Sequence, residues 1–129
     1  MKTIILSSIA AIAMIIMPSR ESIDESDVKK TLIEFAKAAD NNNVDNLDKL
    51  LDSNYRIVMN RLFGSEEVSI LSRDVYLDKI RTKEWGGDKR KVTVQNIIVN
   101  GNSACAKVQY EGEKMSFDSI VLLIKDGHQ

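Results

Sequence analysis

Asp118 is the side chain in this sequence that best fits acid–base chemistry. It lies in the largely apolar run from Met115 to Lys125, where a desolvated carboxylate would have a raised pKa and could act as a general base. A tyrosine hydroxyl could then stabilise the negative charge that develops on a substrate oxygen. The alternative interpretation of Asp118 is a solvent-facing residue near the start of a strand, with no catalytic role.

Four aromatic residues, Tyr55, Tyr76, Trp85 and Tyr110, join Asp118 as candidates for lining a ligand-binding pocket. Tyr55 opens a predicted strand and could point its hydroxyl inward, although core packing also explains it. Trp85 precedes a Gly-Gly pair and could cover an apolar ligand or simply anchor its loop. Tyr76, on the flank of a predicted helix, is expected at the surface or at a pocket rim. The predicted ligand-binding residues are Tyr55, Trp85, Tyr110 and Asp118.

The other reactive residue types predict neither a metal site nor a cofactor. The one cysteine, Cys105, lies inside a predicted strand and cannot form an internal disulfide. The one histidine is His128, and no carboxylate spacing supplies the further ligands that zinc needs. The formal net charge is −1, so no basic field attracts nucleic acid. The short basic cluster Lys89–Lys91 is more typical of a solvated strand start.

Three strand-like runs in the last third of the sequence must position most of these candidates. They span 91–100, 103–111 and 115–125, and short Gly-containing turns join them. One face of the second run is small or apolar: Ala104, Ala106, Val108 and Tyr110. Residues 120–124 are apolar on both faces, which predicts a central strand in an antiparallel meander.

Amphipathic helices upstream are expected to cover the apolar face of this sheet. The first helix has apolar residues at helical spacing: Val28, Leu32, Phe35, Ala36 and Ala39. Ser22–Glu25 fits a capping box before it, and Ser26–Asp27 offers a second cap. A short helix from Val44, a strand from Tyr55 and a third helix over Asp74–Lys83 are expected to follow.

The first residues of the sequence have the pattern of a secretory signal peptide. Met1–Thr3 carries one positive charge, and Ile4–Met17 is apolar apart from two serines. Pro18–Arg20 offers no clean small-x-small cleavage site, so an uncleaved anchor is the alternative. We therefore predict a signal peptide and short leader over 1–21, one domain over 22–129, and a secreted or periplasmic location.

The order of these elements resembles the nuclear transport factor 2-like fold, also called cystatin-like α+β. The resemblance rests on Asp27–Ala39, on the segment NNNVDNLDKLLDSNYRIV (41–58), and on the segment from Ser72 to Gly112 that ends in the meander. Among families of this fold, the sequence most resembles the putative lumazine-binding family and next the SnoaL-like group. The resemblance extends from about Asp24 to the end of the sequence.

This resemblance implies N-terminal helices packed on a strongly bent antiparallel sheet, with a cone-shaped pocket between them. Similar chains usually continue past the turn at Asp126–Gly127 with one more strand, so the sheet here is expected to lack its last strand. The superfamily includes isomerases, dehydratases and binding subunits, so the fold alone does not select a function.

Three functions are open at this point. The absence of an acid–base or nucleophile pair favours a non-catalytic domain that binds a small apolar or heterocyclic ligand. A module that dimerises through its sheet is the second, and an uncovered apolar sheet face would favour it. An isomerase or dehydratase with Asp118 as its base is the third, and it requires Asp118 to lie inside a closed cavity. Neither nucleic acid nor a membrane is an expected partner of the processed protein.

Overall fold

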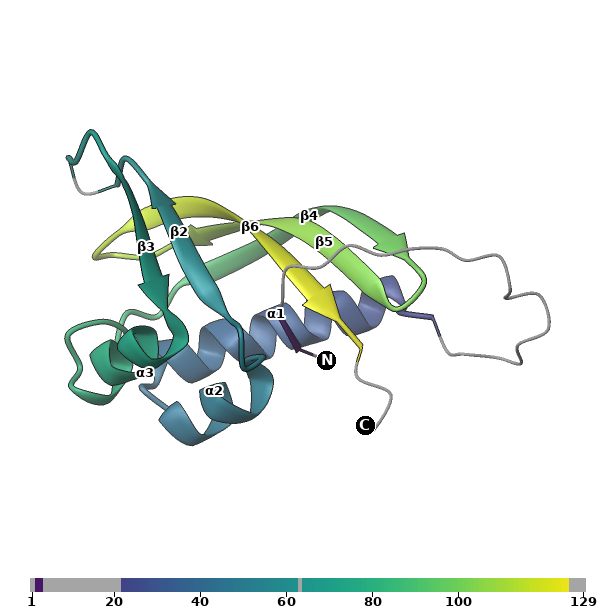
Figure 1. Ribbon diagram of the computed structural model, residues 1–129, viewed down its shortest axis with the longest axis horizontal. Coiled ribbons are helices and arrows are strands. Elements are labelled where there is room, and N and C mark those ends of the chain that lie inside the picture. Colours follow the sequence, from purple (N-terminus) through teal and green to yellow (C-terminus); the bar gives the residue numbers. More distant parts are fainter. Residues whose placement is uncertain (1, 4–21, 63, 126–129) are drawn as a thin grey trace.

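Three helices and six strands make up the described part of the computed structural model, which is residues 2–3, 22–62 and 64–125 (Figure 1). The elements are β1 (Lys2–Thr3), α1 (Glu25–Asp40), α2 (Val44–Leu50), β2 (Arg56–Asn60), β3 (Val68–Ser72), α3 (Arg73–Arg81), β4 (Lys91–Asn100), β5 (Ser103–Glu111) and β6 (Ser116–Ile124). This order confirms the predicted α+β class.

The long helix α1 buries one apolar face, as its periodicity predicts. Its buried residues are Val28, Leu32, Ala36, Ala38 and Ala39. The predicted caps at Ser22 and Ser26 are wrong, because Asp24 is the N-cap residue and its side chain makes no cap hydrogen bond. At the starts of α2 and α3, the side chains of Asn43 and Ser72 do accept backbone N–H bonds.

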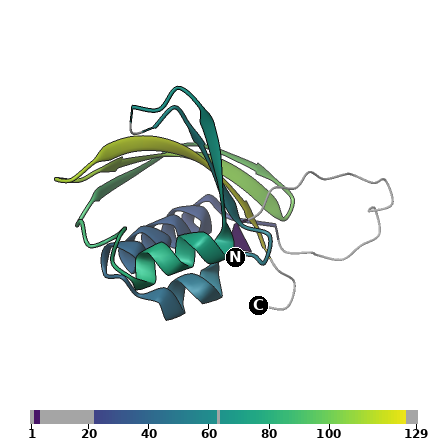
Figure 2. The same cartoon turned by 60° about the vertical axis from the view of Figure 1, so that its left-hand side comes forward.

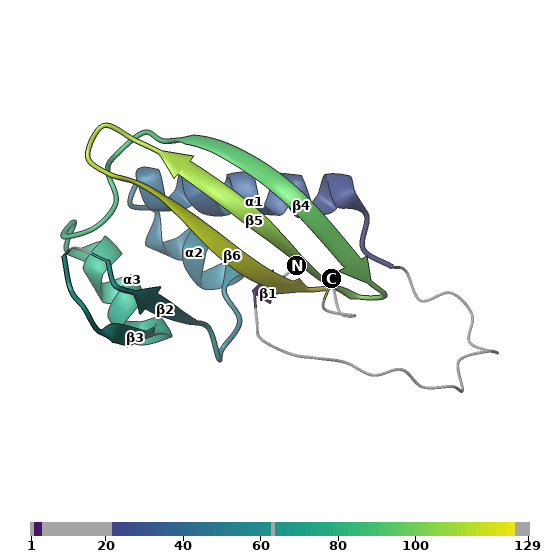
Figure 3. The same cartoon turned by 90° about the horizontal axis from the view of Figure 1, so that it is seen from above.

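Strands β4, β5 and β6 form the predicted antiparallel meander, which lies across the helices (Figures 2 and 3). The β4–β5 register shifts between Gln95 and Ile98, where Asn96 adopts a φ of 51°. Such a bulge bends a strand and increases its twist. The inward face of β5 is the one predicted from its alternation: Ala104, Ala106, Val108 and Tyr110.

Strands β2 and β3 form a separate hairpin that is not paired with the meander (Figure 1). The predicted central strand over 120–124 belongs to β6, which lies between β5 and the two-residue strand β1 in the sheet order. On the side away from β5, only Leu123 and Ile124 of β6 have a described strand partner, which is β1. The edge of β6 from Ser116 to Leu122 therefore has no neighbouring strand among the described residues.

The leader and its processing remain predictions. Lys2 and Thr3 pair with β6, whereas residues 4–21, which contain the apolar run and the expected cleavage region, lie outside the described residues. His128 lies outside them as well. None of the described helices is both long and apolar enough to cross a membrane.

The buried side chains form two clusters. One joins α1 to the inward face of the meander, with Val28, Leu32, Val108 and Leu123 at its centre. The other joins the end of α1 to α2 and α3, with Leu47, Leu77 and Ile80 at its centre and Phe35, Tyr55 and Trp85 packed against it. Aromatic side chains thus gather where the helices face the gap between the two sheets.

Candidate functional site

A cavity of about 750 Å³ lies between the helices, the β2–β3 hairpin and β6. This volume is within the range of small-molecule sites in proteins. Its walls come from the last turns of α1, from residues 54–60 around β2, from α3, from the loop 84–90 and from β6. Two sheets that do not pair with each other leave this space, because the described residues place no strand between β2 and β6.

One wall of the cavity is a cluster of aromatic rings. The ring of Tyr76 lies 5.6 Å from that of Tyr55, 6.3 Å from that of Phe35 and 6.2 Å from that of Trp85, measured between ring centroids. Aromatic rings at these separations pack favourably and present large apolar surfaces. The wall is suited to the apolar or planar body of a ligand.

The polar end of the cavity is an ion pair between Arg90 and Asp40. Arg90 Nε donates to Asp40 Oδ1 at 2.6 Å, and the Arg90 backbone N–H donates to Asp40 Oδ2 at 3.1 Å. Both side chains are largely buried, with exposed fractions of 14% and 11%. The Arg90 guanidinium carbon lies 4.5 Å from the ring centroid of Tyr110, so the pair rests on an aromatic face.

Three tyrosine hydroxyls in this region stay protonated at neutral pH. Burial raises the pKa of Tyr110 to about 12, although the nearby Arg90 charge acts in the opposite direction. Burial also raises the pKa of Tyr76 and that of Tyr55 well above the ordinary value. All three line the cavity, so each presents a neutral hydroxyl that can donate a hydrogen bond.

The loop that carries Trp85 is held at its base by Asn42. Asn42 Nδ2 donates to the carbonyl oxygens of Ile80 and Trp85, both at 2.8 Å. Asn42 itself adopts a φ of 52°, which its residue type tolerates better than most. Gly86 adopts a φ of 90° and packs directly against this side chain. The end of α1 therefore fixes the position of the Trp85 loop, defined here as residues 82–90.

The far end of the Trp85 loop is fastened by Asp88. Asp88 Oδ1 accepts from the Glu113 N–H at 3.1 Å, and Asp88 Oδ2 accepts from the Lys114 N–H at 2.9 Å. These bonds, that of Lys114 first, lower the pKa of Asp88. Asp88 and Lys114 both line the cavity, so this contact joins two parts of its rim.

We predict that Asp88→Asn loosens this part of the rim, because it removes the charge that the two N–H groups bind. Amide hydrogen exchange should show lower protection of Glu113 and Lys114. The matched control is Asp118→Asn, which removes a carboxylate from the exposed outer face of β6 and should leave both amides unchanged. Unchanged protection in Asp88→Asn would show that the carboxylate does not hold the turn.

The lowered pKa of Asp88 also determines how the stability of its contact with Glu113 and Lys114 changes with pH. Because the folded-state pKa of Asp88 lies below its ordinary value of 3.8, the contact contributes fully above that value. The contribution is lost as the pH falls through the lower, folded-state pKa. Protection of the Lys114 amide should therefore be constant from neutral pH down to about pH 4 and fall only below that.

The structure places the Asp118 side chain at the exposed edge of the cavity. Its side chain lies on the sheet face away from the helices, is 53% exposed, and pairs with Lys107 at 3.7 Å. Along β6, Phe117 and Val121 pack on the core of the meander, and Asp118 alternates to the opposite face. The exposure of the carboxylate contradicts the hypothesis of Asp118 as a buried general base. Asp118 still lines the cavity along the edge of β6, so its role as a ligand contact stays a prediction.

The other predicted residues meet in one place. Tyr55, Trp85 and Tyr110 all line the cavity, together with Tyr76, which was expected at the surface or rim but is 6% exposed. Asp40 and Arg90 were not predicted: Arg90 belonged to a cluster interpreted as solvated. In the sequence, Arg90 directly precedes a predicted strand whose first inward-facing residues are apolar. This pattern could have indicated that Arg90 is buried.

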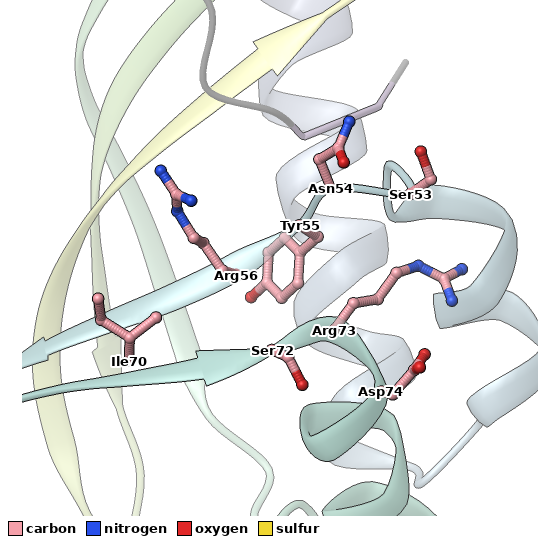
Figure 4. A pocket seen from close by; sticks show the side chains of 8 residues that line it. All are labelled: Ser53, Asn54, Tyr55, Arg56, Ile70, Ser72, Arg73 and Asp74. Carbon is pink, nitrogen blue, oxygen red and sulfur yellow. The ribbon is translucent and has the colours of Figure 1, made fainter.

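A second, smaller hollow of about 390 Å³ lies behind Tyr55, between the start of β2 and the start of α3 (Figure 4). Arg73 Nη2 donates to the carbonyl oxygen of Asp48 at 3.0 Å and to its Oδ1 at 2.8 Å. Arg73 Nε is buried and has no hydrogen-bond partner among the described residues. Because Arg73 is already paired with Asp48, this hollow is a weaker candidate site than the large cavity.

The described residues contain no group of three His, Cys, Asp or Glu side chains that could hold a metal ion. Cys105 is half-buried in β5, where its alternation places it on the outer sheet face. The large cavity thus supplies apolar surface, neutral hydroxyls and the guanidinium groups of Arg56 and Arg90.

The element order and the meander across α1 define a nuclear transport factor 2-like fold. The chain is similar to a solved nuclear transport factor 2-like protein of unknown function from Silicibacter pomeroyi DSS-3, with 14% identity and a TM-score of 0.65, over 79% of this chain and 87% of that one. A putative ketosteroid isomerase from Kribbella flavida DSM 17836 matches with 16% identity and a TM-score of 0.49, over 79% and 71% of the two chains.

The chain belongs to the family described as putative lumazine-binding, whose model matches residues 23–129. No curated protein matches the sequence. The family membership and the first structural match confirm the predicted family and fold. At 14% identity the structural match establishes the fold alone.

Proposed function

We propose that this protein binds a small, largely apolar molecule in the cavity between its helices and its two sheets, without catalysing a reaction. The observation that carries the proposal is a cavity of about 750 Å³ with an aromatic wall and few polar groups at one end. Sites of this composition typically bind small molecules. Membership of a family described as lumazine-binding supports a ligand-binding role.

The state of the cavity carboxylates supports the absence of catalysis. Each of the four carboxylates in its walls already has a partner: Asp40 with Arg90, Glu84 with Lys79, Asp88 with two backbone N–H groups, and Asp118 with Lys107. None of the four is therefore a buried carboxylate without a partner, which is the environment in which many carboxylates act as general bases. The tyrosine hydroxyls are protonated and are poor bases at neutral pH.

We further propose that the protein acts after export, in the periplasm or outside the cell. The sequence pattern of Met1–Met17 supports this location. Mass measurement of the protein recovered from the periplasmic fraction and from the medium would test it. Recovery of only the full-length chain from the cytoplasm would contradict it.

We predict that native mass spectrometry of the exported protein, purified without refolding, finds a bound molecule that Ser119→Phe removes. Ser119 lies on the inner face of β6 and lines the cavity, so a phenyl group there fills part of the space. Ser116→Phe is the matched control, because it makes the same change on the outer face of the same strand. Retention of the extra mass in Ser119→Phe, or its loss from both variants, would contradict binding in this cavity.

A second candidate function is self-association through the outer sheet faces. Large apolar side chains are exposed on the outer face of the meander, with exposed fractions of 77% for Ile120 and 63% for Ile98. Neighbouring Lys107 and Asp118 carry opposite charges, so this face is self-complementary in charge. Exposed apolar patches of this kind commonly mark protein interfaces.

We predict that Ile120→Glu shifts a homodimer to monomer by at least tenfold in its dissociation constant, measured by sedimentation. The matched control is Ile33→Glu, the same substitution at an isoleucine of α1 that is 49% exposed on the opposite side of the fold. A protein that is monomeric at all concentrations would contradict this second function and leave ligand binding unaffected.

A further inference from the structure

One edge of the Arg90 guanidinium is hydrogen-bonded to Asp40, and the other edge has no hydrogen-bond partner among the described residues. Its Nε and the backbone N–H of the same residue donate to Asp40. Its two terminal amino groups make no hydrogen bond to any described residue, yet Arg90 lines the cavity. A guanidinium carries donors only, so its open edge can be satisfied only by an acceptor on the bound molecule or by water.

Two buried tyrosines line the same cavity as Arg90. Tyr76 and Tyr110 are 6% and 3% exposed, and the Arg90 guanidinium carbon lies 4.5 Å from the ring centroid of Tyr110. Neither hydroxyl forms a hydrogen bond with another described residue. The cavity therefore contains a guanidinium edge and neutral hydroxyls as hydrogen-bond donors for a ligand.

The charges around the cavity disfavour an anion as that acceptor. Arg90 is already neutralised by Asp40, so the polar end carries no net charge. The charged side chains in the cavity walls are three basic and four acidic residues: Arg56, Arg90, Lys114, Asp40, Glu84, Asp88 and Asp118. Arg56 and Lys114 are exposed, whereas an anionic head beside Arg90 would lie next to the buried Asp40 carboxylate, and like charges at close range repel each other.

The remaining walls disfavour a ligand with many polar edges. They are formed largely by aromatic and aliphatic side chains, among them Phe35, Ile57, Ile80, Trp85 and Val121. A heterocycle such as lumazine carries several ring nitrogens as well as carbonyl groups, and most of these would lose hydrogen bonds to water against such walls. Each unpaired polar group would weaken binding.

We infer that the ligand of this cavity is a largely apolar molecule with one uncharged acceptor oxygen, such as a ketone, which Arg90 and the two buried tyrosines bind. This inference rests on the proposed binding function and specifies the class of ligand. It departs from the heterocycle in the description of the family.

Four probes test the inference on the wild-type chain by calorimetry. They are 2-acetylnaphthalene, with an uncharged acceptor; 2-ethylnaphthalene, of similar shape without it; 2-naphthoate, with an anionic head; and lumazine. The ketone should bind roughly 10- to 100-fold more tightly than 2-ethylnaphthalene, as expected for a hydrogen bond to a charged donor. The naphthoate and lumazine should bind more weakly than the ketone.

Variants locate the acceptor site. The double variant Asp40→Asn with Arg90→Gln keeps a neutral hydrogen-bonding pair and should abolish the preference for the ketone over 2-ethylnaphthalene. Tyr110→Phe, which keeps the ring, should reduce the preference by a smaller factor. Arg61→Gln, an exposed arginine outside the cavity, is the control and should change neither affinity.

The outcomes separate this inference from the proposed function. Equal binding of the ketone and 2-ethylnaphthalene, or tighter binding of 2-naphthoate or lumazine, overturns the ligand class and leaves ligand binding in place. A double variant that retains the preference for the ketone also overturns it. If none of the four probes binds and the exported protein carries no extra mass, the proposed function fails as well.

Discussion

Arg90→Met should lower the free energy of unfolding by about 3–5 kcal/mol, the largest single effect expected in this protein. The substitution leaves the Asp40 carboxylate 11% exposed and without the two hydrogen bonds that Arg90 donates. A buried carboxylate without a partner loses its hydrogen bonds to water and gains no hydrogen bond or ion pair in the protein. The same substitution removes the guanidinium from the face of Tyr110. Urea unfolding followed by circular dichroism measures the loss.

A double variant separates the cost of the unpaired charge from the cost of lost packing. In Asp40→Asn with Arg90→Met, no charge is left buried, so the double variant should be more stable than Arg90→Met alone. Lys89→Met, a substitution at the exposed neighbour, should change stability by less than about 0.5 kcal/mol. If the double variant is less stable than the single one, the charge is not the cause of the loss.

The second large effect is expected from Gly86→Ala, which should cost about 2–4 kcal/mol. At a φ of 90° an alanine is strained wherever it lies. In addition, its Cβ would meet the carbonyl oxygen of Ala39 and lie 2.7 Å from Asn42 Nδ2. Both neighbours are fixed, one in the backbone of α1 and the other by two hydrogen bonds, so neither can easily move away.

The matched control for this prediction is Gly101→Ala. Gly101 also has a positive φ, 63°, but an added Cβ there would meet no atom within 4 Å. Gly101→Ala should therefore show the backbone strain alone, about 1 kcal/mol. The fluorescence of Trp85, the single tryptophan, should shift to the red in Gly86→Ala only, because the loop detaches from Asn42. If both variants lose the same stability and show the same Trp85 fluorescence, the contact of Gly86 with the end of α1 does not position the loop.

These two predictions concern the same part of the molecule. Asp40 and Asn42 are two residues apart at the end of α1. Asn42 holds Trp85 within the Trp85 loop, and Asp40 holds Arg90 at the end of that loop. The end of α1 therefore positions both the polar end and part of the aromatic wall of the cavity. A substitution that moves this helix end should affect ligand binding even where it touches no ligand.

Local patterns in the sequence determined the elements. The spacing of Val28, Leu32 and Ala36 predicted the buried face of α1, and the alternation of β5 predicted its inward residues, because both depend only on the geometry of one element. The same geometry, with the turns between strands, predicted the meander and the family. Tyr55, Trp85 and Tyr110 could be proposed as pocket residues from their type and their place on these elements.

Only the tertiary structure decided the chemistry of the site. Alternation along β6 places Asp118 and Phe117 on opposite faces of the sheet. Which of the two faces packs on the helices depends on the whole sheet. Arg90 is interpreted as solvated from its neighbours in sequence, yet it is buried against Asp40, fifty positions away. The sequence by itself therefore determined the fold and indicated Tyr55 and Trp85 of the aromatic wall. Tertiary packing brought Tyr76 into that wall and decided where the charges lie.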